Sequence, residues 1–138
     1  MNERVVKSTG DVIDIGWAKV FGSGLAFVLE QHLALVELRV LLHLIATMKA
    51  GSNAVVNARA AVLAETLGHD RSNVSRALRK LEEMHLIRRQ VDHATRVSGA
   101  QVNPFVACKM DSDRRGRLIA EGGWHKPVGA PQEKPSCG

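Results

Sequence analysis

The segment Asp70–Met84 (DRSNVSRALRKLEEM) limits the possible folds of this chain more than any other segment. Val74, Leu78 and Leu81 recur at helical spacing, so the segment is predicted to form an amphipathic helix with one apolar stripe. Asp70 stands at the N-cap position, where its side chain can accept from the free amide groups of the first turn. The apolar stripe predicts a contact with the core, which leaves the other face for solvent or for a partner.

The opposite face of this helix is polar and positively charged. Ser72, Arg76 and Arg79 point away from the apolar stripe, and Asn73 and Lys80 flank them. An Arg side chain matches the O6/N7 edge of guanine, Asn matches the edge of adenine, and Ser reaches a phosphate or a base. This face therefore predicts a recognition helix for the major groove of DNA, and the alternative is a solvated surface helix that happens to be basic.

The charge of the chain is unevenly distributed. The 138 residues have a formal net charge of +5, and 45% of them are hydrophobic, which fits one globular domain. Residues 1–50 hold five Lys/Arg and five Asp/Glu, so the whole positive excess lies in residues 51–138. A neutral half beside a basic half predicts a core joined to a surface that binds a polyanion.

Several functional classes are disfavoured by what the sequence lacks. Cys108 and Cys137 form no CxxC pair, so neither a disulfide framework nor a thiolate zinc site is expected. The six histidines are scattered, and no HExxH, GxSxG or Gly-rich phosphate loop is present. No segment resembles a signal peptide or a membrane span. We therefore expect a cytoplasmic protein that is not an enzyme, holds no metal or other cofactor and does not enter a membrane.

The region before the basic helix is expected to supply the core. Residues 1–22 are predicted to be an N-terminal arm. A short helix is expected over Leu25–His32, with Leu25, Ala26, Val28 and Leu29 pointing inward. Val36–Met48 is apolar on nearly all sides, so it is predicted to be the central core helix or part of a subunit interface.

A second helix is predicted directly before the basic one. Ala58–Leu67 has the spacing of a helix, Asn57 is placed to cap its start, and Gly68 is suited to end it in the left-handed conformation. A very short strand, Ala54–Val56, precedes it. A helix, a Gly-containing turn and a second helix with a polar outer face are the parts of a helix-turn-helix.

Two strands joined by a basic tip are predicted after the basic helix. The first strand begins at Leu86 and the second ends at Val102, and the residues between them are polar and turn-like. Such a hairpin forms a wing, which would place Arg88, Arg89 and Arg96 within reach of phosphates or the minor groove. Successive strand residues point to opposite faces, so at most one of the first two arginines is expected to lead this contact.

The last part of the chain has little periodicity. Residues 104–110 (PFVACKM) are expected to pack back on the core. Residues 111–138 contain Arg114, Arg115 and Arg117 and are rich in Gly and Pro from Gly122 onward. This composition predicts a basic, disordered tail, and it leaves residues 23–110 as the folded domain.

Two phrases resemble known families. Leu63–Arg89 (LAETLGHDRSNVSRALRKLEEMHLIRR) is similar to the core of MarR-type bacterial regulators, in which a helix ending in LG precedes a VSRALxxLE helix and an LIxR strand. Val102–Met110 (VNPFVACKM) resembles the NPxxAxKG phrase after the wing in RepL-type plasmid replication proteins, with Met110 in place of the final Gly. The resemblance implies an α+β, mostly α fold, a winged helix-turn-helix with a two- or three-stranded β-wing.

The resemblance also implies roles for individual side chains. Ser72, Asn73 and Arg76 fall where such families contact base edges, and Ser75 falls where they commonly hold a phosphate. Helical spacing independently places Ser72 and Arg76 outward. The full set expected to bind DNA is Arg71, Ser72, Asn73, Ser75, Arg76, Arg79, Lys80, Arg88, Arg89 and Arg96.

Together these features predict a sequence-specific protein that binds double-stranded DNA and inserts residues 71–84 in the major groove. It is expected to be a bacterial transcriptional regulator or a plasmid replication or maintenance factor. The alternative is a winged-helix protein–protein interaction module with non-specific DNA affinity. A homodimer is expected, with Val36–Met48 and Val12–Leu29 as the candidate interface, and no residue identifies a small-molecule effector.

Overall fold

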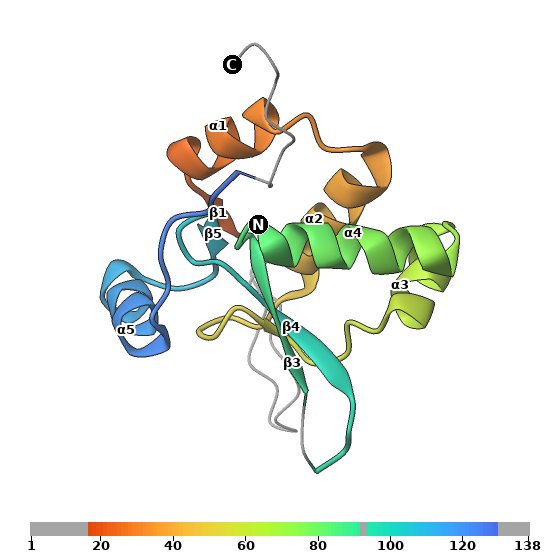
Figure 1. Cartoon of the computed structure of the whole chain (residues 1–138). Helices are drawn as coiled ribbons and strands as arrows, with labels where there is room; N and C mark the ends of the chain where they lie inside the picture. The colour runs from red at the N-terminus through yellow and green to blue at the C-terminus, as the bar shows by residue number, and fades with distance from the viewer. Residues whose placement is uncertain (1–16, 92–93, 130–138) are drawn as a thin grey trace.

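Two helices of equal length, α2 (Leu35–Thr47) and α4 (Arg71–Glu83), pack against each other at the centre of the molecule (Figure 1). The structure is a computed structural model that describes residues 17–91 and 94–129. The predicted apolar stripe of α4 is confirmed, because each of its side chains is buried. The stripe and the side chains of α2 buried in the same core are Val74, Ala77, Leu78, Leu81, Val40, Leu41, Leu44 and Ile45.

The described residues form an α+β fold with five helices and two small antiparallel sheets. The remaining helices are α1 (Gly22–Glu30), α3 (Ala60–Leu67) and α5 (Ser112–Gly122). One sheet has the strand order β2-β4-β3, formed by Ala54–Val55, Ser98–Val102 and Ile87–Val91. The other pairs β1 (Lys19–Val20) with β5 (Ala107–Cys108). Across residues 17–91 and 94–129, every helix is too short or too polar to cross a bilayer.

The turn between α3 and α4 follows the prediction, but the caps of both helices differ from it. Gly68 ends α3 in the left-handed conformation, with φ 74° and ψ 38°. α3 begins at Ala60, two residues later than predicted, because the amide of Ala58 donates to Ser98 O at 2.8 Å and holds the chain against β4. Asp70 does occupy the N-cap of α4, yet its side chain accepts no capping hydrogen bond.

The predicted hairpin after α4 is confirmed as β3 and β4, which Figure 1 shows projecting from the helices. Ile87 pairs with Val102 and Val91 pairs with Ser98. β2 joins the other edge of β4, where a side chain at Gly99 would place its Cβ 2.7 Å from Val55 O. Only Gly permits this approach, so the third strand depends on that residue.

The predicted inward face of α1 is confirmed at Val28 and wrong at both leucines and at Ala26. Leu25 and Leu29 are exposed, while Gly24 and Val28 are buried. A Cβ on Gly24 would lie 2.8 Å from Val106 Cα, so the missing side chain lets the helix lie directly on that backbone. Close packing of backbone against backbone therefore decides the orientation of α1, and the exposed leucines remain without cover among the described residues.

The prediction of a disordered tail from residue 111 is wrong for the described part of it. Residues 112–122 form α5, and the Asp111 side chain caps this helix by accepting from the amide of Arg114 at 2.8 Å. Trp124 is buried, and the amide of Val128 donates to Met84 O at 2.9 Å. The segment after α5 thus packs against the end of α4, and residues 130–138 lie outside the described residues.

The segment 104–110 packs on the core as predicted, and two polar side chains at its ends hold it there. Asn103 is fully buried; its Nδ2 donates to His85 O at 2.7 Å and to His125 O at 2.9 Å, and its Oδ1 accepts from the amide of Phe105 at 2.8 Å. The Nζ of Lys109 donates to Ala46 O at 2.8 Å and Met48 O at 3.0 Å at the end of α2. These side chains join α4, the final segment and α2.

Candidate nucleic-acid interface

The exposed face of α4 carries the side chains that the sequence assigned to DNA. Arg71, Ser72, Arg76 and Arg79 are exposed, and Asn73 and Ser75 are partly buried at its edges. The helix presents this face because the opposite stripe is buried against α2 and α3. The structure therefore brings six predicted residues together on one side of a single rigid element.

Two of these side chains hold each other in place. The Nη2 of Arg76 donates to the Oδ1 of Asn73, one turn earlier on the helix. This bond fixes the guanidinium along the helix axis and leaves the amide nitrogen of Asn73 as a free donor. The remaining N–H groups of Arg76 and Asn73 are donors, which the acceptor edge of guanine and phosphate oxygens can accept.

The charge of α4 changes sign along its length. Arg71, Arg76 and Arg79 form no ion pair within the described residues, whereas Glu82 and Glu83 are exposed near the other end. The N-terminal end of a helix also carries the positive end of the backbone dipole. The first turns of α4 are therefore the part best suited to a polyanion.

Lys80, also predicted to bind DNA, forms an ion pair within the protein. Its Nζ lies 3.4 Å from Glu37 Oε1 of α2, and the same carboxylate oxygen accepts from the amide of Ala34 at 2.8 Å. The lysine thus links α4 to the first turn of α2. Surface pairs of this kind contribute little to stability, and this one directs the Lys80 side chain toward α2.

The arginines of the β3–β4 hairpin divide between two faces, as strand geometry predicts. Arg88 donates from Nη1 to Gly122 O at 2.9 Å and lies 3.7 Å from the centre of the Trp124 ring. It therefore holds the segment after α5. Arg89 belongs to the other face, where its Nε is buried without a hydrogen-bond partner in the described part of the chain.

Arg96 lies at the tip of the hairpin. It is exposed and has a φ of 61°, a left-handed conformation that turns the chain back toward β4. Residues 92 and 93 of the same tip lie outside the described residues. Of the three hairpin arginines, Arg96 is the one whose position suits a contact with a distant phosphate.

Sequence reasoning missed a cation beside the turn that precedes α4. The Nη1 of Arg39, on α2, lies 2.9 Å from the Nε2 of His69. The pair is 30 residues apart in the chain, so no local pattern indicates it. The contact with His69 places the exposed guanidinium of Arg39 at the α3–α4 turn, close to the start of α4.

The described residues contain no group of three or more His, Cys, Asp or Glu side chains that could hold a metal ion. In comparisons with known proteins, no family model, no curated protein and no solved structure matches the chain.

Proposed function

We propose that this chain is a winged helix-turn-helix protein that binds specific double-stranded DNA by inserting α4 in the major groove. The observation that carries the proposal is the exposed face of α4: three arginines without carboxylate partners in the described residues, with Ser72 and Asn73 beside them. A helix of this width fits the major groove, and these side chains carry donors that base edges accept.

The order of elements supports the same reading. α3, the left-handed Gly68 and α4 have the arrangement of a helix-turn-helix, and the β3–β4 hairpin follows directly. In this proposal Arg96 at the hairpin tip contacts the DNA backbone. Arg88 and Lys80 take no direct part, because each is engaged within the protein.

The alternative is a module that binds another protein through the same face. Such a face tends to expose large apolar or aromatic anchors at its centre. The exposed side chains of the first turns of α4 are Arg71, Ser72, Arg76 and Arg79, so duplex DNA fits this face better. Transcriptional regulation and plasmid replication or maintenance use the same contacts with DNA, and both roles remain within the proposal.

The test is selection of binding sites by the full chain from a randomised duplex library at physiological salt. We expect enrichment of one motif, with the affinity falling steeply as salt rises because phosphate contacts release counterions. Equal recovery of all sequences would contradict the proposed function, even if the affinity depended on salt.

The proposal includes a homodimer, and the exposed leucines of α1 and α2 support it. Leu29 is 68% exposed and Leu35 is 67% exposed, and Leu25 and Leu42 are exposed on the same two helices. Large apolar side chains in this number on adjacent elements are typical of an interaction surface. A two-fold pair of domains would read two half-sites and so gain both affinity and length of site.

Replacing Leu29 and Leu35 by Glu should convert the dimer to a monomer, because each carboxylate would have to be buried at the interface without a partner. Size exclusion with light scattering at micromolar concentration measures this change. The control is Val91→Glu, an exposed apolar position on the hairpin, which should leave the mass unchanged. A wild-type protein that is already monomeric under these conditions would contradict the dimer.

A further inference from the structure

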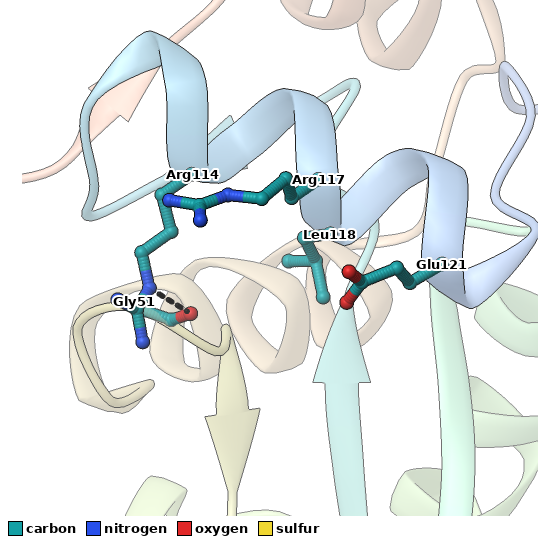
Figure 2. A pocket seen from close by; sticks show the side chains of 5 residues that line it. All are labelled: Gly51, Arg114, Arg117, Leu118 and Glu121. Atoms are coloured by element: carbon teal, nitrogen blue, oxygen red, sulfur yellow. Dashed lines mark hydrogen bonds between the residues drawn. The ribbon is translucent and has the colours of Figure 1, made fainter.

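A pocket of about 260 Å³ opens between α5 and the turn that joins α2 to β2 (Figure 2). It lies outside the α4 face and involves none of the residues assigned to DNA above. Its lining residues are Gly51, Arg114, Arg117, Leu118 and Glu121.

The floor of the pocket is shaped to hold one guanidinium. The Nε of Arg114 donates to Gly51 O at 3.3 Å, and the Gly51 amide donates to Lys109 O at 3.1 Å. Gly51 has a φ of 88°, and a Cβ there would lie 3.3–3.5 Å from the atoms of the Arg114 guanidinium. The φ of Gly51 therefore favours glycine at this turn, and the Arg114 guanidinium lies against it. The Nη groups of Arg114 make no hydrogen bond to the described residues.

A second arginine, Arg117, extends toward the stem of Arg114, whose own guanidinium lies at Gly51. Figure 2 shows Arg117 extended back along α5 toward Arg114 and away from Glu121, which is one turn further on. Arg117 is exposed and has no hydrogen bond or ion pair within residues 17–91 and 94–129. Two like charges that line one pocket repel each other, so an anion bound in the pocket would stabilise both.

We propose that this pocket binds a phosphate group. Planar guanidinium groups match phosphate oxygens with paired N–H donors, and the position of Arg114 is already set by Gly51. Two arginines exceed the single carboxylate of Glu121, which leaves the pocket with a net positive charge. The phosphate belongs either to the backbone of DNA bound at α4, in which case the inference rests on the proposed function, or to a free phosphoester.

The first measurement is an NMR titration of the full chain with inorganic pyrophosphate at low salt. We expect shifts of the Gly51 amide and of the Arg114 and Arg117 side-chain Nε–H signals. Arg117→Ala should weaken this binding by at least about fivefold, since it removes one of the two charge-assisted contacts. Glu121→Gln should strengthen it, because a repelling charge is lost. Arg117 is chosen because it supports no described contact, so the variant should fold normally. Lys126→Ala, exposed beyond α5, is the matched control.

The second measurement separates the two sources of phosphate. If the phosphate is that of DNA, Arg117→Ala should reduce the slope of log K against log salt by about 0.9 while the selected motif stays the same. If it is a free phosphoester, Arg117→Ala should weaken pyrophosphate binding by the same factor and leave the slope for DNA unchanged. If pyrophosphate shifts the NMR signals of the pocket but the protein binds no duplex, the proposed function is overturned and the proposed phosphate site stands. Unmoved Gly51 and Arg117 signals, or pyrophosphate binding by Arg117→Ala equal to wild type, would overturn the pocket.

Discussion

Asn103→Ala should lower the free energy of unfolding by about 2–4 kcal/mol, because a buried polar network loses its central side chain. The variant leaves His85 O, His125 O and the amide of Phe105 without their present partner, in a place where Asn103 itself is fully buried. Each unsatisfied buried group costs about 1–3 kcal/mol, and the costs are not additive within one network. Urea unfolding followed by circular dichroism measures the loss.

Asn57→Ala is the matched control for this change. Asn57 is exposed, and its Oδ1 makes only a long contact of 3.4 Å with the amide of Arg59. Its loss should cost less than about 0.5 kcal/mol, because Arg59 and not Asn57 is the N-cap of α3, contrary to the prediction. Equal losses for the two variants would show that Asn103 does not hold the final segment to α4.

Lys109→Met should reduce stability by about 2–4 kcal/mol, since a buried ammonium group holds the end of α2. The last carbonyls of a helix have no partner within it, and the Nζ of Lys109 donates to two of them, Ala46 O and Met48 O. A cation at this end also interacts favourably with the helix dipole. Met keeps the length of the side chain and removes the charge and the donors.

Lys49→Met is the matched control, because Lys49 is exposed and close in sequence to the same helix end. It should change stability by less than about 0.5 kcal/mol. A Lys109→Met protein as stable as wild type in urea unfolding would contradict the predicted contribution of this side chain to stability.

The central elements could be predicted because their signals are local. The stripe of Val74, Leu78 and Leu81 and the position of Gly68 predict α4 and the turn before it, and both are confirmed. The orientation of α1 could not be predicted in this way, since it depends on the contact of Gly24 with Val106, far away in the chain. α5 has signals that were missed, namely the Asp111 cap and Gly123 in the left-handed conformation at its end.

The orientation of a site residue could be predicted where it depends on the position of that residue along a helix. It could not be predicted where a residue far away in the chain binds the side chain. Arg76 and Ser72 lie outward because Val74 and Leu78 lie inward. Helical spacing also placed Lys80 beside this face, but it did not indicate the ion pair that Lys80 makes with Glu37 of α2. Arg88 is engaged by Gly122 and Trp124, from a segment that appeared featureless in the sequence. Contacts between residues far apart in the chain produce no periodic pattern in the sequence, so they could not be predicted from it.

The most direct test of the central claim compares the motifs selected by wild type and by Arg76→Ala, with affinities measured by fluorescence anisotropy. If α4 reads the major groove, Arg76→Ala should relax the preference at one base pair and weaken binding to the wild-type motif by about 1–3 kcal/mol. Lys126→Ala, with the same loss of charge, should leave every base preference unchanged. If Arg76→Ala instead keeps the same motif and loses no more affinity than Lys126→Ala, then α4 does not read base edges and the assignment of this face is wrong.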